Sequence, residues 1–330
     1  MSMASSVISG GAGFIYSHVA RHFVNLGWDV IIADHFDMQG KGKNIADLLP
    51  RVRLIIGDLT VGALAARCAE VRPDYVVHAA AYTHVDDSIT DPERFMLNNV
   101  LGTTRLLQAF SQSGHIPTRI LIVSTDEVYG STPPGVAFTE SQPFAPSNAY
   151  AASKVVVEAI AGAFHTTHTL PILIVRPCNT YAPGQFPAKV IPKFIGQLLR
   201  NELVTLYNDG QGSRDWLHAE DHARAVETIL DRGQVGEAYN LGADEEHTDR
   251  DILIRIEAIL SYLGYLTTPG SIAKVPGRPG HDRRYRMQTD KLRALGWVPQ
   301  VAFSDGLRET VRWNAEHQEY WAHDLVGVAG

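Results

Sequence analysis

The chain has 330 residues, of which 45% are hydrophobic and 20% are charged, as in an ordinary globular protein. Its net charge of −7 gives no basic surface, which excludes nucleic acid and anionic membranes as main partners. No apolar run approaches a membrane span, and no signal-peptide pattern opens the sequence. The only two cysteines, Cys68 and Cys178, lie far apart and form no metal-ligand spacing. We therefore expect a cytoplasmic protein without a metal site.

The first half of the chain alternates short apolar runs with helical patterns. Valine and isoleucine fill runs typical of strands buried on both faces, at 5–9, 29–33, 52–56, 75–79, 120–124 and 172–176. Helical patterns lie between them, at 14–26, 60–71, 92–113 and 148–167. This alternation predicts an α/β fold with a doubly wound parallel sheet of the Rossmann type over residues 1–177.

The pattern changes after residue 177. The stretch PCNTYAPGQFP indicates a loop, and helical patterns follow at 188–200, 220–231, 249–263 and 304–317, with short strands among them. We expect residues 178–330 to form a smaller α/β part that mainly binds substrate. Some of its segments are expected to cross back to the sheet.

A glycine-rich turn, SGGAGFIYSH, joins the first predicted strand to the first helix. Gly10, Gly11 and Gly13 permit a tight turn and let backbone N–H groups approach a pyrophosphate at the helix N-terminus, although an ordinary tight turn would look similar. Asp34, at the end of the second strand, suits a carboxylate that bonds an adenosine ribose, and it favours NAD over NADP because it would repel a 2′-phosphate. Asp58, after the third strand, suits an adenine contact or a helix N-cap, and the two roles are compatible.

One position departs from the glycine pattern. The spacing predicts a third glycine at position 16, where the sequence has Tyr16. The third glycine normally lets the helix pack closely on the sheet. A tyrosine there is either accommodated by local repacking or weakens dinucleotide binding.

Two further motifs, STDEVYG after the strand at 120–124 and YAASK at the start of a helix, carry reactive side chains. Tyr150 and Lys154 are four residues apart and so share one helix face. The lysine is expected to lower the phenol's pKa and to hold a nicotinamide ribose, so that the phenolate takes a hydroxyl proton as hydride leaves for NAD. Thr125 would bond the same hydroxyl. The alternatives are an exposed Tyr–Lys pair and a solvated loop around the carboxyls of residues 126 and 127.

The motifs together resemble the extended short-chain dehydrogenase/reductase superfamily, and within it the nucleotide-sugar 4,6-dehydratases of the dTDP-glucose type. The resemblance extends through about residue 300 and is carried by GGAGFI, HVDDSI, NNVLGT, STDEVYG, YAASK, QFPAKVIP, SRDWLHAEDHA and RPGHDRRY. The Thr-Asp-Glu triplet discriminates best, because sister epimerases and decarboxylases usually lack the acid pair.

The resemblance implies an answer to why two acids stand side by side. Tyr150 and NAD would oxidise the sugar C4 hydroxyl, and the resulting ketone would acidify the C5 proton. Glu127 would remove that proton while protonated Asp126 donates to the departing C6 hydroxyl, because neighbouring acids in different environments can hold different protonation states. The hydride would then return to C6. The net reaction is dehydration of an NDP-hexose to an NDP-4-keto-6-deoxyhexose by a hydro-lyase.

The resemblance also implies ligand contacts. Those to NAD fall at Gly10, Gly13, Phe14, Ile15, Asp34, Asp58, Leu59, Ala79, Ala80, Tyr150 and Lys154. Those to the nucleotide-diphosphate sugar fall at Thr83, Asn179, Lys189, Arg214, Asn240 and Arg278. Arginine forks match phosphate oxygens, so Arg214 and Arg278 are expected at the diphosphate. Surface ion pairs with Asp215 or Asp282 are the alternative.

Some positions depart from the dehydratase pattern. Tyr82 stands where the dTDP-glucose enzymes typically carry a glutamate, and Thr180 and Ala182 interrupt the usual NNYGP. These departures bear on the substituents of the sugar.

A homodimer is common in the family and is expected here through 92–113 and 148–167, whose apolar faces could instead pack only on the sheet.

Other functions use much of the same sequence. A 4-epimerase or a 5,6-dehydratase of the superfamily would share the oxidation at C4. A non-catalytic nucleotide-binding or sensor protein would explain Tyr16, but a protein without chemistry has no reason to keep Thr125, Asp126, Glu127 and Tyr150 together.

Overall fold

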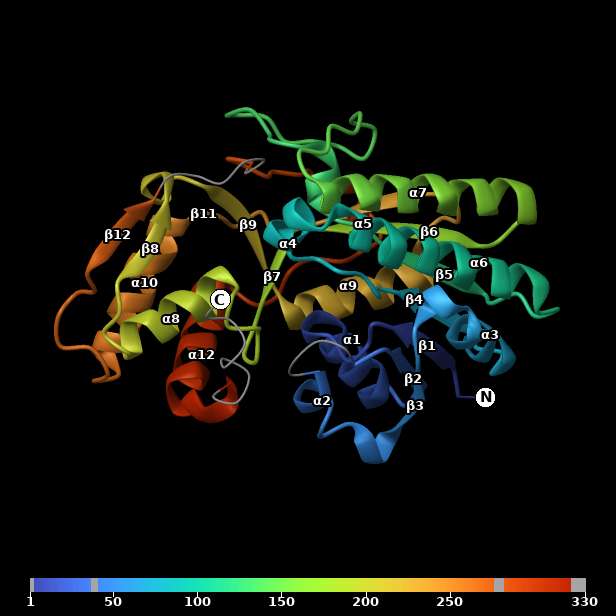
Figure 1. The fold of residues 1–330 in the computed structure, drawn as a ribbon, viewed down its shortest axis with the longest axis horizontal. Coiled ribbons are helices and arrows are strands. Elements are labelled where there is room, and N and C mark those ends of the chain that lie inside the picture. Colours follow the sequence, from blue (N-terminus) through green and yellow to red (C-terminus); the bar gives the residue numbers. More distant parts are fainter. Residues whose placement is uncertain (1–2, 37–40, 276–281, 322–330) are drawn as a thin grey trace.

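A seven-stranded parallel sheet forms the centre of the molecule (Figure 1). The structure is a computed structural model, which describes residues 3–36, 41–275 and 282–321. The strand order is β10-β6-β5-β4-β1-β2-β3. The strands are β1 (Ser5–Ser9), β2 (Asp29–Asp34), β3 (Val52–Ile56), β4 (Tyr75–His78), β5 (Arg119–Val123), β6 (Ile172–Pro177) and β10 (Ala238–Leu241). The doubly wound parallel sheet predicted from the sequence is confirmed.

The strand order reverses beside β1, because β2 and β3 lie on one side of it while β4, β5 and β6 lie on the other. In open parallel sheets, ligands bind at the carboxyl ends of the strands near such a reversal. The glycine turn follows β1, and STDEVYG follows β5. The topology therefore brings both motifs to the same edge of the sheet.

Helices cover both faces of the sheet (Figure 1). On one face lie α1 (Phe14–Asn25) and α9 (Ala219–Arg232), and on the other lie α3 (Ala63–Glu70), α6 (Gly102–Gln112) and α7 (Ala149–His168). Successive residues of a strand point to opposite faces. Accordingly, Ile8 packs in the α1–α9 layer, while Val7 packs in the layer of α3, α6 and α7. Burial on both faces explains why the strand sequences are almost continuously apolar.

The single helix predicted over 92–113 is wrong in detail. The segment begins with α5 (Pro92–Phe95), passes through a π-helical turn η3 (Met96–Leu101) and continues as α6. Within that turn, Asn99 accepts from the backbone N–H of Tyr82 at 2.8 Å and donates to Ser153 Oγ at 2.9 Å. π-helical turns are frequent at functional sites, and this one joins the segment after β4 to the helix that carries YAASK.

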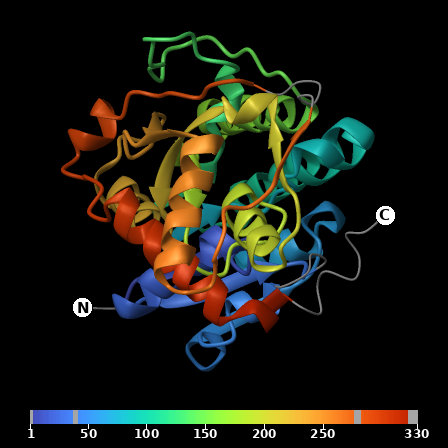
Figure 2. The same cartoon turned by 90° about the vertical axis from the view of Figure 1, so that its left-hand side faces the viewer.

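Among the described residues, the smaller part contains two short sheets and three main helices, and it faces the viewer in Figure 2. One sheet has β7 (Asn179–Tyr181), β9 (Ser213–His218) and β11 (Glu246–Thr248), and the other has β8 (Val204–Tyr207) and β12 (Ile272–Val275). The helices are α8 (Val190–Leu199), α10 (Asp249–Tyr262) and α12 (Phe303–Glu316), which pack around their own apolar core. Both α9 and β10 come from residues after 178, so part of this half of the chain lies against the main sheet.

Short helical elements complete the chain. They are α2 (Lys41–Asn44), η1 (Leu49–Arg51), η2 (Leu59–Val61), α4 (Val85–Thr90), η4 (Asp126–Tyr129), η5 (Asn208–Gly210), α11 (Asp290–Arg293) and η6 (Gln318–Trp321). Among the residues that the structure describes, no helix is long and apolar enough to cross a membrane.

Candidate active site

The glycine turn after β1 is closed tightly onto the chain after β4. Gly10 has a φ of 74°, and a Cβ atom there would lie 2.7 Å from the backbone nitrogen of Ala80. Its own N–H donates to the carbonyl of Ala33 at 2.8 Å. Only glycine fits this position, because any side chain would collide with the backbone around Ala79 and Ala80.

The N-terminus of α1 is suited to an anion. Gly13 precedes the helix and provides no side-chain cap, and no acidic residue occupies the first turn, which begins with Phe14 and Ile15. Uncapped N–H groups and the helix dipole both favour a negatively charged group, such as a pyrophosphate. The residues present therefore fit the dinucleotide that the sequence predicts.

Two carboxylates stand where adenosine contacts were predicted. Asp34, the last residue of β2, accepts from the N–H of Ala12 in the glycine turn at 3.1 Å, so it lies directly beside the turn. Asp58 caps η2 by accepting from the N–H of Thr60 at 2.7 Å, and Leu59 follows it at the start of that turn. The N-cap expected as compatible with an adenine contact is present.

Tyr16 is buried in the helix layer, with 6% of its surface exposed. Its ring packs edge-on against His222 of α9, and its hydroxyl lies 3.2 Å from His222 Nε2. Nδ1 of the same histidine lies 3.0 Å from Oγ1 of Thr180. Burial lowers the pKa of His222 to about 3, so the ring is neutral and can donate through one nitrogen while it accepts through the other. This packing favours local repacking as the way the chain accommodates Tyr16.

The segment after β5 places a hydroxyl and two carboxyls in one turn. Thr125 caps η4, accepting from the N–H of Glu127 at 3.3 Å and donating to Oδ1 of Asp126 at 3.1 Å. The other oxygen of Asp126, Oδ2, is buried and has no hydrogen-bond partner among the described residues. Buried polar atoms are rarely left unpaired, and exceptions often mark sites of chemistry or ligand binding.

The two acids differ in their surroundings. Burial, and next the charge of Glu127, raise the pKa of Asp126 to about 8, so this acid carries a proton at neutral pH. Burial raises the pKa of Glu127 overall, and a hydrogen bond from Asn148 and the charges of Arg214 and Lys189 offset this rise only in part. The arrangement therefore suits Asp126 to donate a proton and Glu127 to accept one.

The helix that carries YAASK is capped by Asn148, which the sequence analysis did not select. Its Oδ1 accepts from the N–H of Ala151 at 2.8 Å, and its Nδ2 donates to Oε2 of Glu127 at 3.1 Å. An asparagine directly before a helical pattern is the ordinary signal of an N-cap, and that signal could have identified this residue.

Tyr150 and Lys154 are both buried on α7, one turn apart. Burial, and next the charge of Glu127, raise the pKa of Tyr150, while a hydrogen bond with Thr125 lowers it. Burial lowers the pKa of Lys154 to about 8. The net pKa of the phenol is raised because burial of the ring outweighs the contact that lowers it. The expected effect of Lys154 on that pKa stays a prediction. The exposed Tyr–Lys pair is also ruled out by this burial.

The charge of Arg214, on β9, lowers the pKa of both Asp126 and Glu127. Its Nη2 donates to the main-chain oxygen of Asp282 at 2.8 Å, and its guanidinium lies 4.5 Å from the ring centroid of Tyr285. Backbone and ring contacts hold the guanidinium in place next to the predicted reaction site.

The other predicted substrate contacts are spread around this region. Lys189 precedes α8 and is close enough to Glu127 to lower its pKa. Asn179 begins β7, and Thr83 is exposed just before α4. Arg278 lies outside the described residues.

The structure argues against a direct substrate contact at Asn240. Its side chain is fully buried, and its Oδ1 accepts from the hydroxyl of Tyr129 at 2.7 Å. Its Nδ2 donates to the carbonyls of Phe138 at 3.1 Å and Gln288 at 3.2 Å. Because the amide's hydrogen-bonding capacity is used within the protein, Asn240 braces the turn that ends at Tyr129.

Tyr82 is turned toward α5. The guanidinium of Arg94 lies 4.2 Å from its ring centroid, and its ring packs on Phe95 with a centroid separation of 5.9 Å. Phe95 also packs edge-on against Tyr150 at 6.4 Å. This departure from the dehydratase pattern therefore lies one aromatic ring away from the predicted catalytic phenol.

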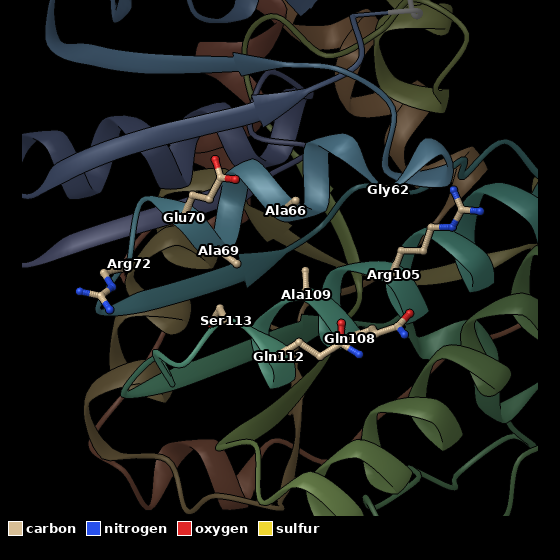
Figure 3. Close-up of a pocket in the computed structure, with 10 residues that line it drawn as sticks. All are labelled: Gly62, Ala66, Ala69, Glu70, Arg72, Arg105, Gln108, Ala109, Gln112 and Ser113. Carbon is tan, nitrogen blue, oxygen red and sulfur yellow. The ribbon is translucent and has the colours of Figure 1, made fainter.

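An open groove of about 500 Å³ lies between α3 and α6 (Figure 3). None of the residues predicted for the active site lines it. Its lining consists of Gly62, Ala66, Ala69, Glu70, Arg72, Arg105, Gln108, Ala109, Gln112 and Ser113.

Comparison with known proteins gives consistent matches along most of the chain. Residues 6–242 match the NAD dependent epimerase/dehydratase family. The chain is 38% identical over 324 residues to dTDP-glucose 4,6-dehydratase of Streptomyces niveus, a match that covers 96% of this chain and 94% of that protein. It is 37% identical to dTDP-glucose 4,6-dehydratase 1 of Escherichia coli K12, covering 93% and 91% of the two chains.

Solved structures agree with the sequence matches. The crystal structure of the dTDP-glucose 4,6-dehydratase DesIV from Streptomyces venezuelae, with NAD and TYD bound, superposes with a TM-score of 0.88 at 40% identity and covers 96% of this chain and 98% of its own. A UDP-glucose 4-epimerase of Thermus thermophilus in complex with NAD superposes with a TM-score of 0.86 at 31% identity, covering 95% and 99%.

Proposed function

The chain belongs to the NAD-dependent epimerase/dehydratase family, and we propose that it is a nucleotide-sugar 4,6-dehydratase acting on an NDP-hexose such as dTDP-glucose. The observation that carries the proposal is the pair of carboxyls after β5, with Asp126 buried and protonated and Glu127 held by Asn148. An enzyme that only oxidises and reduces C4 has no use for this pair. The product is an NDP-4-keto-6-deoxyhexose.

NAD is the cofactor, and when bound it would supply the hydride chemistry for oxidation at C4 and reduction at C6. The turn at Gly10 and Gly13 and the first N–H groups of α1, at Phe14 and Ile15, would hold its pyrophosphate. The remaining contacts are assigned to Asp34, Asp58, Leu59, Ala79, Ala80, Tyr150 and Lys154.

The first task of the protein is to remove the proton of the C4 hydroxyl. Tyr150, as the phenolate, takes this proton, and Thr125 orients the same hydroxyl. Lys154 supplies the positive charge that favours the phenolate as the proton moves. The surrounding apolar core excludes water, since both Tyr150 and Lys154 are almost fully buried.

The second task is the elimination. Glu127 removes the C5 proton, whose bonding electrons form the C5–C6 double bond as the C6–oxygen bond breaks. Asp126 gives its proton to the leaving hydroxyl, which departs as water. Glu127 then returns its proton to C5, and the proton taken by Tyr150 in the first step balances the one that Asp126 lost.

The diphosphate and sugar are assigned to the smaller part, residues 178–330, and NAD to residues 1–177. Arg214 and Lys189 supply positive charge beside Glu127, and Arg278 is proposed to join them at the diphosphate. Asn179 and Thr83 are proposed to contact the phosphate or sugar. We propose that Asn240 acts indirectly, through Tyr129.

We further propose that the protein is a cytoplasmic homodimer. The turn η3 continues directly into α6, and both pack against α7. Leu97 of η3 and Val156 of α7 are exposed. Pairing of these helices across a two-fold axis would bury both side chains. Cys68 and Cys178 are free thiols in the interior, in keeping with a reducing compartment.

Product analysis tests the proposal. The protein, supplied with NAD and a panel of NDP-hexoses, is expected to yield a product that has lost one water and carries a C4 ketone. A product of unchanged mass with an inverted C4 hydroxyl would indicate a 4-epimerase, and an exocyclic alkene would indicate a 5,6-dehydratase. No conversion together with no NAD binding would indicate a sensor protein.

A further inference from the structure

A second carboxylate lies on the catalytic face of α7. Tyr150, Lys154 and Glu158 follow one another at intervals of four residues, which places them along one side of the helix. The exposed fraction is 3% for Lys154 and 5% for Glu158. The reaction as proposed above gives Glu158 no role.

Glu158 is held by Arg176 of β6 in a fork. Arg176 donates from Nε to Oε1 at 3.0 Å and from Nη2 to Oε2 at 2.6 Å, and both side chains are buried. Its remaining nitrogen, Nη1, donates to the carbonyl of Glu140 at 3.0 Å and to the hydroxyl of Tyr129 at 2.5 Å. The guanidinium is therefore fixed on every side.

Tyr129 connects this ion pair to the acids. It is the last residue of η4, the turn that begins with Asp126 and Glu127. Its hydroxyl accepts from Arg176 and donates to Oδ1 of Asn240 at 2.7 Å. A continuous buried chain of hydrogen bonds thus runs from the helix of Tyr150 to the turn that carries both acids.

Such an ion pair is a poor device for stability alone, because apolar residues of similar volume often do as well or better in the same place. Glu158 also has an electrostatic effect on Lys154, one helical turn away. Burial lowers the pKa of Lys154 to about 8, and the charge of Glu158 raises it. His78 of β4 is a further titratable group near Lys154, and it is neutral because burial, and next the charge of Lys154, lower its pKa to about 3.

We propose that Glu158 and Arg176 are positioning residues that keep Lys154 protonated beside Tyr150 and fix, through Tyr129, the turn that aims the two acids. The inference rests on the proposed function, because the two residues are assigned to the two stages of that reaction, the oxidation of C4 and the elimination of water. Glu158 acts on the oxidation stage through the charge of Lys154. Arg176 acts on the elimination stage through Tyr129.

Substitution of Glu158 by glutamine is expected to change the pKa of Lys154 in a definite direction. The change removes a negative charge near Lys154 and leaves the positive charge of Arg176 unbalanced, so the pKa of Lys154 falls. Lys154 is charged below its pKa and neutral above it. The alkaline limb of C4 oxidation, and of NAD affinity, is therefore expected to move to lower pH by about one unit.

The experiment measures both limbs in four proteins: the parent, Glu158→Gln, the double variant Glu158→Gln with Arg176→Gln, and Val157→Ala. The limb should shift in Glu158→Gln and return toward the parental pH in the double variant, which carries neither charge. Val157→Ala loses packing on the same helix without a change of charge, so its limb should stay in place. A folded Glu158→Gln variant with an unmoved limb would overturn the electrostatic role.

Tyr129→Phe tests the mechanical role without changing a charge. It removes the hydroxyl that joins Arg176 to Asn240, so elimination should slow by roughly 10- to 100-fold while C4 oxidation keeps its parental rate. Equal slowing of both stages, or of neither, would overturn this role. If the proposed function itself is wrong, the parental protein will form no 4-keto product. If only this inference is wrong, the parent will form that product and the pH dependence of the variants will be unchanged.

Discussion

The side-chain amide of Asn148 donates to Oε2 of Glu127 at 3.1 Å, and so the cap of the helix that carries Tyr150 also holds the proposed base. The same bond lowers the pKa of Glu127, whereas no such donor reaches Oδ2 of Asp126 among the described residues. The difference between the two adjacent acids is thus built by the local fold. We propose that this difference suits Glu127 to act as the base and Asp126 as the proton donor.

Asn148→Ala tests this relationship. Loss of the donor should raise the pKa of Glu127, so the acidic limb of the elimination rate should move to higher pH. Loss of the cap should also lower the free energy of unfolding by about 1 kcal/mol. Thr248→Ala is the matched control, because Thr248 caps α10 away from the acids and should lower stability without moving the limb. An unchanged limb in Asn148→Ala would contradict the assignment of the base.

The acids themselves are tested by Glu127→Gln and Asp126→Asn. Both variants should still oxidise C4, while elimination slows by about 10²-fold or more, the usual effect of losing a general acid or base. Transient absorbance of reduced cofactor, followed after mixing with substrate, separates the two stages. Tyr150→Phe should abolish the first stage instead. Parental elimination rates in both acid variants would refute their roles.

The protonation of Asp126 predicts a pH dependence. Its pKa is raised to about 8, so the proton needed by the leaving hydroxyl is present below pH 8 and is lost as the pH rises through this value. The elimination rate should therefore decline in alkaline solution. An elimination rate that stays level well above pH 8 would show that another group supplies the proton.

The same raised pKa predicts a stability change. The protein destabilises the ionised form of Asp126, so this residue costs stability increasingly as pH rises from its ordinary pKa of 3.8 toward about 8. Asp126→Asn removes that cost. Its urea midpoint should exceed the parental midpoint at pH 8, and the difference should shrink in acid. A lower midpoint at pH 8 would mean that the protein does not destabilise the ionised form of Asp126.

We expect substitution of Tyr16 to change the stability of the protein rather than its affinity for NAD. Tyr16→Phe removes only the hydroxyl near His222 and should cost about 1 kcal/mol of unfolding free energy. Tyr16→Gly also removes a buried ring and should cost roughly 3–5 kcal/mol. NAD affinity of the folded variants, measured by calorimetry, should equal or exceed that of the parent. A clear loss of affinity in Tyr16→Phe would make Tyr16 a cofactor contact.

The sequence predicts the central sheet well. Six expected strands agree with observed strands to within one residue at each end, because short runs rich in valine and isoleucine between turn signals indicate strands. The π-helical turn η3 was missed, since it depends on the side chain of Asn99 bonding residues distant in sequence. The crossing of β10 back to β6 was expected only in general, because a four-residue strand carries little periodicity.

Some residues of the candidate site could be identified from the sequence, and others could not. Gly10, Asp34 and the STDEVYG segment could be selected because motif spacing specifies them. Glu158 was not selected, since its importance comes from Arg176, 18 residues away in the chain. Asn148 carries a local N-cap signal, but its bond to Glu127, 21 residues away, has no signal in the sequence. The rise in the pKa of Tyr150 comes first from burial, which no spacing reveals.

The central claim is that one hydride leaves C4 and the same hydride returns to C6. It is tested most directly with an NDP-hexose that carries deuterium at C4, turned over with NAD and analysed by mass spectrometry and NMR. The account predicts a dehydrated 4-keto product whose deuterium is found at C6. Deuterium returned to C4 of an undehydrated sugar, or lost from the product, would contradict it.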